Sequence, residues 1–316
     1  MTDLLLLLVG FAALIFGATK LVDAASGLAS KMGVPSIVIG LTIVAFGTSA
    51  PELVVNVFAA VKGNTEMVLG NVLGSNIFNV LGILGVSAII APLTVKTNTT
   101  WLEIPLSLLA AVTVFVLAGD IFLDKATQNV VSRSEGIVLL LFFLIFLVYN
   151  MVVAKSGNAE EEIETKDYSV PMAILWIVVG LAGLVIGGRL IVTSAVSIAE
   201  ELGLSERVIG LTVVSIGTSL PELATSIIAV RKKNVDIAIG NVVGSNIFNI
   251  FLILGVSGTI VPITIHPASF FDILVNILAG LLLFIFIFTG KGRQLERWEG
   301  AVFLLIFVAY LAYLIV

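Results

Sequence analysis

A block of 49 residues occurs twice in this chain, and the second copy lies 170 positions after the first. Residues 40–88 and 210–258 align without a gap and share 27 identical pairs. Both copies contain Gly-Thr-Ser-x-Pro-Glu, at residues 47–52 and 217–222, within segments that are otherwise apolar. A carboxylate at membrane depth is unfavourable by about 2.5–3.5 kcal/mol on insertion scales, so its duplication predicts a function.

The composition is that of a membrane protein. Of the 316 residues, 59% are hydrophobic and 12% are charged, which is about half the charged share of a soluble domain. Apolar runs of about 20 residues can cross a bilayer. We predict an all-α polytopic membrane protein with ten transmembrane helices, at about 3–23, 34–60, 66–91, 103–120, 134–154, 170–194, 204–230, 235–261, 270–289 and 298–316.

The ten spans divide into two halves of five. The predicted halves are residues 1–154 and 170–316, and a hydrophilic linker at 155–169 joins them. Because five is odd, two related halves must enter the membrane in opposite orientations. This is the inverted-repeat plan of secondary transporters, whose site lies near the midplane where the repeats meet.

The basic residues predict the orientation. Loops after odd-numbered spans carry ten Lys and Arg residues, whereas loops after even-numbered spans carry four. The positive-inside rule then places the odd-numbered loops and the linker in the cytoplasm and both termini outside. Four acidic residues fall at predicted span ends, where we expect them to be interfacial: Asp23, Asp120, Asp124 and Asp272.

Several kinds of site are disfavoured by the residue types. The chain has no cysteine and a single histidine, His266, so thiolate and histidine-rich zinc sites are excluded. We expect no cofactor, no nucleic-acid partner and no obligate protein partner. The lipid bilayer and the transported ions are the expected partners.

Glu52 and Glu222 are the central candidates for chemistry. Two inverted copies would bring these side chains face to face, and two carboxylates with a formal charge of −2 suit Ca²⁺ or a set of Na⁺ ions. Hydroxyl residues three and four positions earlier share the helical face of each glutamate. They are Thr48, Ser49, Thr218 and Ser219.

The proline in each motif predicts a break in the helix. Pro51 has no N–H, so the carbonyl of Gly47 loses its helical partner. We expect the break to expose carbonyls one turn back, and the candidates for cation binding are those of Ala45 and Ser215.

A second duplicated motif, Gly-Asn-x-x-Gly-Ser-Asn-Ile-Phe-Asn, occupies residues 70–79 and 240–249. Its glycines form a small-xxx-small pattern, which allows close helix approach. Asn79 and Asn249 are the preferred ligand candidates, and Ser75 and Ser245 lie one turn earlier on the same face. For Asn71 and Asn241, interhelical hydrogen bonding and a functional role remain equally open.

The two paired motifs resemble the alpha repeats of the calcium/cation antiporter superfamily, especially its prokaryotic sodium/calcium exchangers. The resemblance implies ten helices, termini outside the cell membrane, and four ion sites between helices 2, 3, 7 and 8. It implies carboxylate ligands from Glu52 and Glu222, hydroxyls from Thr48, Ser49, Thr218, Ser219, Ser75 and Ser245, carbonyls from Ala45 and Ser215, and an amide oxygen from Asn79. Some relatives, including potassium-dependent exchangers, have Asp where this chain has Asn249, so we expect no potassium dependence.

The predicted function is secondary active antiport of Na⁺ against Ca²⁺, in which competition for the same oxygens couples the two fluxes. As a hypothesis, spans 1 and 6 slide across the four-helix core, with close contacts at Gly10, Gly17, Gly180, Gly183, Gly187 and Gly188. Ca²⁺/H⁺ antiport is the nearest alternative, and a passive cation channel is another. An intramembrane enzyme is disfavoured, because no histidine or membrane lysine is near Ser49 or Ser219 in sequence to act as a base.

Overall fold

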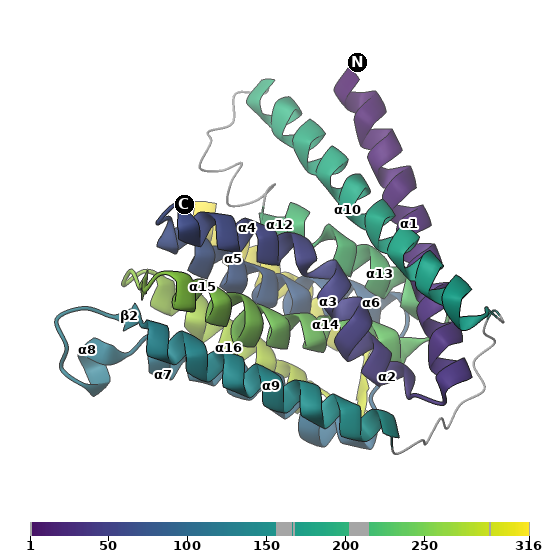
Figure 1. Ribbon diagram of the computed structural model, residues 1–316. Helices are drawn as coiled ribbons and strands as arrows, with labels where there is room; N and C mark the ends of the chain where they lie inside the picture. The colour runs from purple at the N-terminus through teal and green to yellow at the C-terminus, as the bar shows by residue number, and fades with distance from the viewer. Residues whose placement is uncertain (1, 156–165, 167, 202–214, 291, 316) are drawn as a thin grey trace.

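The computed structural model describes residues 2–155, 166, 168–201, 215–290 and 292–315, and this part of the chain is mostly helical. Here α denotes an α-helix, η a π-helical segment and β a strand, and Figure 1 labels many of the α-helices. The first half contains α1 (Thr2–Met32), α2 (Ser36–Ile39), η1 (Gly40–Val44), α3 (Ala45–Thr48), α4 (Ala50–Val61), α5 (Thr65–Ile77), η2 (Phe78–Leu84), α6 (Gly85–Ile90), β1 (Leu93–Thr94), η3 (Thr99–Glu103), α7 (Ile104–Leu117), α8 (Asp120–Leu123), β2 (Val130–Val131) and α9 (Arg133–Lys155).

The described elements of the second half repeat much of this order. It contains α10 (Val170–Glu201), α12 (Ser215–Thr218), α13 (Leu220–Arg231), α14 (Val235–Ile247), η5 (Phe248–Leu254), α15 (Gly255–Ile260), β3 (Ile263–Thr264), α16 (Ser269–Phe286), β4 (Gln294–Leu295) and α17 (Arg297–Ile315). From α4 to β1, every element recurs 170 residues later with the same length, as α13 to β3. The duplicated sequence therefore folds into duplicated elements.

The membrane-spanning elements agree with the polytopic prediction. Within the described residues, eight helices are long and apolar enough to cross a bilayer, and the bent pair Ser36–Thr48 and Ala50–Val61 makes nine. The predicted span at 204–230 begins in residues outside the described part and continues as α12 and α13. The predicted first span is too short, because α1 continues to Met32.

Two continuous helical stretches form the centre of the molecule. In Thr65–Ile90 and Val235–Ile260, 78% and 94% of the most apolar window is buried, whereas the other single spans are 22–33% buried. The halves are also interleaved: α9 packs on α15 and η5 of the second half, and α17 packs on α6 and η2 of the first. Each central stretch is thus covered by the last helix of the other half.

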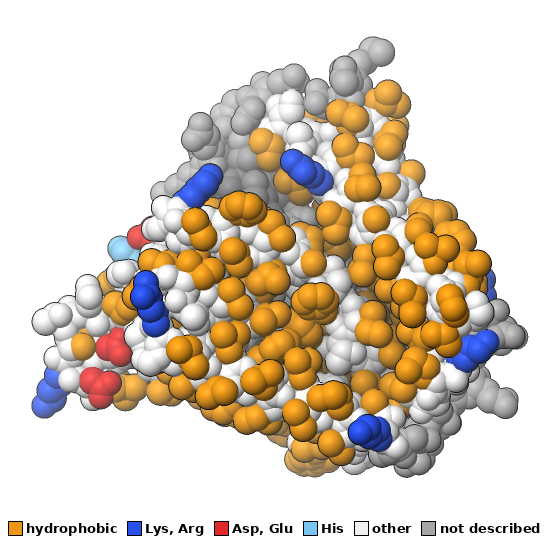
Figure 2. All heavy atoms as spheres, viewed as in Figure 1, with side chains coloured by type: hydrophobic (Ala, Val, Ile, Leu, Met, Phe, Trp, Pro, Cys, Tyr) orange, Lys and Arg blue, Asp and Glu red, His pale blue; other side chains and the backbone are white. Residues whose placement is uncertain are grey.

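Loops that follow odd-numbered spans contact one another, and loops that follow even-numbered spans contact one another. The loops after odd-numbered spans meet through the β1–β4 ladder, the Lys96–Asp236 ion pair at 2.9 Å and a hydrogen bond from Lys31 to the carbonyl of Tyr168. The β2–β3 ladder joins two loops of the even-numbered set. In Figure 2, hydrophobic side chains cover most of the visible face, with Lys and Arg mostly towards its margin. This distribution is typical of a lipid-facing surface between two wet sides.

Both Gly-Thr-Ser-x-Pro-Glu motifs interrupt a helix. Ser49 has φ −84° and ψ 3° between α3 and α4, and Ser219 has φ −93° and ψ 9° between α12 and α13. In the first half, the two segments are bent by 47°. Proline in the first turn of the following helix tolerates the missing N–H, because that donor would have no intrahelical partner there. The predicted break is present in both copies.

The two long helices α1 and α10 lie side by side along the edge of the bundle (Figure 1). Their contact is made by glycines. A Cβ at Gly17 would lie 2.6 Å from the carbonyl oxygen of Gly180, and one at Gly187 would lie 2.6 Å from the nitrogen of Leu14. The expected contact with the core is therefore wrong for most of these glycines: Gly10, Gly17, Gly180, Gly183 and Gly187 face the partner helix, and Gly188 alone faces Pro221 of α13.

Gly187 and its neighbour Gly188 give a matched test of this packing. Gly187→Ala should lower the free energy of unfolding by about 1–3 kcal/mol, because the added methyl group forces two backbones apart. Gly188→Ala should lower it less, since the nearest atom to its Cβ would be Pro221 Cδ at 3.8 Å. Thermal unfolding in detergent measures both. Equal losses would contradict the assignment of Gly187 to the contact between α1 and α10.

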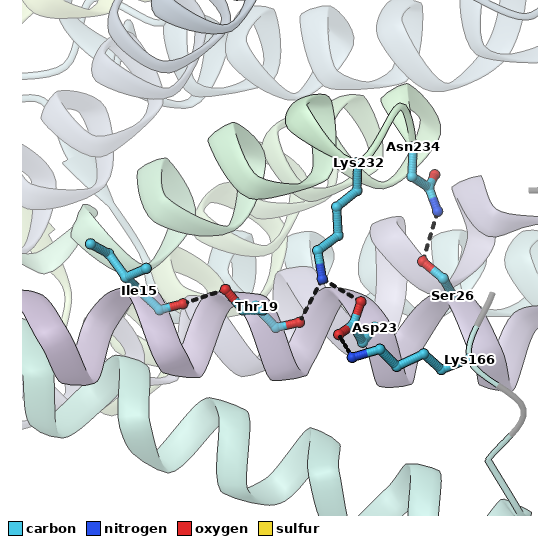
Figure 3. Close-up of polar contacts among 7 residues, drawn as sticks. All are labelled: Ile15, Thr19, Asp23, Ser26, Lys166, Lys232 and Asn234. Carbon is cyan, nitrogen blue, oxygen red and sulfur yellow. Dashed lines mark hydrogen bonds and ion pairs between the residues drawn. The ribbon is translucent and has the colours of Figure 1, made fainter. Parts of the chain in front are cut away.

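Asp23 lies within α1, which continues to Met32, and its side chain is buried. Figure 3 shows its carboxylate between the ammonium groups of Lys232, from the loop after α13, and Lys166, which is 2.8 Å away. Lys232 also donates to the carbonyl of Thr19 at 3.3 Å. These ion pairs compensate the charge of a carboxylate on an otherwise apolar helix. The hydrogen bond to Asp23 raises the pKa of Lys166.

This cluster should contribute to stability through Lys232 more than through Lys166. Lys232→Ala should lower the free energy of unfolding by about 1–3 kcal/mol, a value between those of exposed and buried pairs. Lys166→Ala should cost less than about 1 kcal/mol, because its side chain is 57% exposed. Lys62 is the exposed residue at the equivalent position of the first half, and Lys62→Ala is the matched control. If Lys62→Ala destabilises the protein as much as Lys232→Ala, the ion pair is not the cause.

Candidate functional site

Glu52 and Glu222 occupy the first turns of α4 and α13, directly after the two helix breaks. Both side chains are buried, with 2% and 0% of their surface exposed. The prolines fix where the new helices begin, and the glutamate one position later points from the first turn into the bundle. Two carboxylates are thus held among four helix segments in an apolar surrounding, where an uncompensated charge is strongly unfavourable.

The serine of each motif contacts the glutamate of the other half. Ser49 Oγ donates to Glu222 Oε1 at 3.0 Å, and Ser219 Oγ donates to Glu52 Oε1 at 3.3 Å. Ser245 Oγ lies 2.9 Å from Ser49 Oγ and 3.5 Å from Glu222 Oε1. The two breaks therefore face one another, and each half completes the hydrogen bonding of the other half's carboxylate.

The asparagines of the second motif also pair between halves. Asn79 Nδ2 donates to Asn246 Oδ1 at 2.9 Å, and Asn249 Nδ2 donates to Asn76 Oδ1 at 2.9 Å. Asn79 and Asn249 are the second residues of the π-helical segments η2 and η5. Short π-helical segments are frequent at functional sites, and no pattern in the sequence predicted these two.

Among the described residues, several buried oxygens of these elements have no hydrogen-bond donor. They include Glu52 Oε2, Glu222 Oε2, Asn79 Oδ1 and Asn249 Oδ1, together with Asn56 Oδ1 on α4 and Thr225 Oγ1 on α13. The element α4 packs against η5 and α13 against η2, so each glutamate helix adjoins the π segment of the opposite half. Leaving one buried acceptor unpaired costs about 1–3 kcal/mol. A cluster of carboxylate and amide oxygens without donors is the ligand set that a hard cation requires.

The remaining predicted ligands differ in the contacts that their side chains make. Thr48 Oγ1 donates to Asn241 Oδ1 at 3.0 Å and also interacts with the Glu222 carboxylate, whereas Ser75 Oγ donates to Asn71 Oδ1 at 3.4 Å. Thr218 is half-buried next to Ser219. Ser215 begins α12, and its side chain lies outside the described part of the chain.

The expected free carbonyl at Ala45 is not present. Its oxygen accepts from the backbone N–H of Ser49 at 2.9 Å and from Thr48 Oγ1 at 3.3 Å, so the helix continues hydrogen-bonded up to the break. Ala45 itself packs tightly on α14, where a Cβ at Gly244 would lie 2.7 Å from the Cβ of Ala45. In the second half, Gly240 and Gly244 thus allow the close approach that their spacing predicted. A Cβ at Gly70 or Gly74 would have no atom of the described residues within 4 Å.

Three polar residues near the site were not among the predicted ligands. Asn56 Nδ2 donates to the carbonyl of Glu52 at 2.7 Å, and Asn241 Nδ2 donates to the carbonyl of Glu222 at 3.1 Å and to Ser226 Oγ at 3.0 Å. The available signal was spacing, because Asn56 and Ser226 each lie four residues after a glutamate on the same helical face. For Asn241, the open alternative of interhelical hydrogen bonding is what the structure displays.

Within the described part of the chain, the two carboxylates are not joined by further acidic or histidine residues in a metal-binding group. No group of three or more His, Cys, Asp or Glu side chains suited to a metal occurs among the residues that the structure describes. A cation at this site would therefore be held by two charges and by neutral oxygens. That donor set matches a transported alkali or alkaline-earth ion more closely than a resident transition metal.

Comparison with known proteins agrees with this geometry. The chain matches the model of the sodium/calcium exchanger protein family over residues 2–152 and 172–316. It is 36% identical to the sodium/calcium exchanger MaX1 of Methanosarcina acetivorans, over 99% of this chain and 98% of the relative. It is also 36% identical to the inner membrane protein YrbG of Escherichia coli, over 98% of this chain and 95% of the relative.

Solved structures agree as well. The fold matches the sodium-calcium exchanger NCX_Mj, soaked with 10 mM Na⁺ and zero Ca²⁺, with a TM-score of 0.82 and 32% identity over 98% of each chain. The resemblance to prokaryotic sodium/calcium exchangers is confirmed, and with it the multi-pass membrane fold. This family consists of transporters, so the chain is a membrane antiporter of the sodium/calcium exchanger family.

Proposed function

We propose that this protein exchanges Na⁺ for Ca²⁺ across the membrane by alternating access to a site centred on Glu52 and Glu222. The observation that carries the proposal is the crossed pairing of two buried carboxylates with the serines of the opposite halves. Each carboxylate keeps one oxygen without a hydrogen-bond donor. Two negative charges balance one Ca²⁺ or two Na⁺, so either cargo neutralises the same group.

The proposed ligands are the predicted ones with one exception. Oxygens would come from Glu52, Glu222, Thr48, Ser49, Thr218, Ser219, Asn79, Asn249, Ser215, Ser75 and Ser245. Ala45 is left out, because its carbonyl already accepts hydrogen bonds from Ser49 and Thr48. The unpartnered oxygens of the two glutamates and two asparagines support the central four. Asn249 is an amide, so the site would have no third carboxylate, which supports independence from potassium.

The proposed architecture is ten transmembrane helices in two inverted repeats, residues 1–154 and 170–316, joined by a cytoplasmic linker. It is supported by the 170-residue spacing of the elements and by the association of the odd-numbered loops on one side. That side carries the larger number of Lys and Arg residues. By the positive-inside rule it would be cytoplasmic, and both termini would lie outside.

Uptake of radioactive Ca²⁺ into proteoliposomes loaded with Na⁺ tests the exchange. Uptake should require internal Na⁺, because vesicles loaded with K⁺ supply no counter-ion. Glu52→Gln and Glu222→Gln should each reduce it at least about 100-fold, since the loss of one charge at a two-carboxylate site costs more than about 2.7 kcal/mol. Glu66→Gln, an exposed carboxylate in the first turn of α5, is the control and should behave like wild type.

Other outcomes of the same assay support the alternatives. Uptake driven by a pH gradient without Na⁺ would assign the protein to Ca²⁺/H⁺ exchange. Uptake that follows the Ca²⁺ gradient and ignores both Na⁺ and pH would indicate a channel. Full activity in both glutamine variants would remove the paired carboxylates from the mechanism.

The crossed serines make a second prediction. Ser49→Ala and Ser219→Ala should each raise the Ca²⁺ concentration for half-maximal uptake about tenfold, because each removes one hydroxyl ligand worth about 1.4 kcal/mol. Ser134→Ala is the control, since Ser134 is exposed at the start of α9. An unchanged half-maximal concentration in both alanine variants would show that the serines only complete the packing of the two breaks.

A further inference from the structure

The second motif contains a pair of asparagines that the proposed ligand set leaves without a role. Asn76 and Asn246 lie at equivalent positions in the two halves, and both are buried, with 1% and 4% of their surface exposed. Each precedes a proposed ligand by three residues on the same helical face. Both side chains are hydrogen-bonded across the interface between the halves rather than along their own helix.

An asparagine ligand must be oriented before it can bind a cation. Its amide has an acceptor end, Oδ1, and a donor end, Nδ2, which are nearly equal in size. Shape alone therefore does not decide which end faces the ion. A hydrogen-bond acceptor that binds Nδ2 fixes the orientation and leaves Oδ1 for the cation.

Asn246 and Asn76 supply these acceptors. Asn246 Oδ1 accepts from Asn79 Nδ2, and Asn76 Oδ1 accepts from Asn249 Nδ2, both at 2.9 Å. The opposite ends, Asn79 Oδ1 and Asn249 Oδ1, are buried without a donor. Asn76 is itself held by a 3.2 Å hydrogen bond from its Nδ2 to the backbone carbonyl of Asn246.

We infer that Asn76 and Asn246 are positioning residues that orient the amide ligands of the opposite half, Asn249 and Asn79. This inference rests on the proposed cation site. The orienting partner comes from the other repeat in both cases, so the correct amide orientation exists only when the two halves are docked. The first and last asparagines of Ser-Asn-Ile-Phe-Asn thus act in crossed pairs, 76 with 249 and 246 with 79.

The crossed pairing is tested by double-mutant cycles on the full-length protein, with Ca²⁺ binding measured by titration calorimetry in detergent. Asn76→Leu and Asn246→Leu remove the acceptor, and Asn79→Ala and Asn249→Ala remove the oriented ligand. Each single variant should raise the Kd for Ca²⁺ about tenfold. Interacting residues give non-additive effects in such cycles, whereas independent residues give additive ones.

The expected pattern distinguishes positioning from a structural role. In the crossed combinations, Asn246→Leu with Asn79→Ala and Asn76→Leu with Asn249→Ala, the Kd should rise only about tenfold, because the acceptor has no amide left to orient. In the same-helix combinations it should rise about a hundredfold. A purely structural role would make all four combinations additive, and that result would overturn the inference.

Two control measurements separate the positioning role from other causes of weaker binding. Asn76→Asp and Asn246→Asp keep an acceptor oxygen and should keep the Kd at or below about three times the wild-type value; a loss as large as that of the leucine variants would overturn the inference. Wild type must bind Ca²⁺, and Glu52→Gln must not. If wild type fails to bind Ca²⁺, the proposed function itself is wrong and the inference falls with it, whereas additive cycles with normal wild-type binding refute the positioning role alone.

Discussion

The structure depends on two carboxylates that are buried together in an apolar bundle. Removing such groups from water is unfavourable by several kcal/mol for each charge. Neighbouring polar groups must therefore compensate the two charges. Neither half does this alone, because the serine that contacts Glu222 comes from the first half and the serine that contacts Glu52 comes from the second. The duplicated sequence therefore makes one site, and the site requires both copies.

The local backbone follows from this requirement. The breaks at Ser49 and Ser219 end one helix and begin another at the depth of the glutamates, which turns side chains and helix ends towards the centre. The π-helical segments η2 and η5 begin one residue before Asn79 and Asn249. Irregular backbone at membrane depth is tolerated only where protein or a polar cavity surrounds it, and these segments belong to the most buried stretches of the chain.

Much of this could be predicted from sequence, because the decisive information is local and occurs twice. Repeated residues form repeated elements, and an apolar run with a proline and a glutamate correctly predicted a broken span. The functional role predicted for the carboxylate stays a prediction. The crossing of the serines and asparagines depends on how the halves dock, which no local pattern contains. The ion pairs of Asp23 could not be predicted either, because its partners, Lys166 and Lys232, are distant in sequence. The free carbonyl expected at Ala45 was wrong because the helix keeps its hydrogen bond up to Ser49.

The same buried pair explains why exchange would be coupled under the proposed function. With a cation bound, the charges of Glu52 and Glu222 are compensated, and the site can be enclosed while it changes sides. Without one, enclosure would leave two adjacent carboxylates with unpartnered oxygens in a dry interior, at a cost of several kcal/mol for each charge. Each 1.4 kcal/mol reduces the population of that enclosed empty state tenfold. Under the proposed function, the return step would therefore require a counter-ion, and the unfavourable burial of these two residues would prevent transport of one ion without the other.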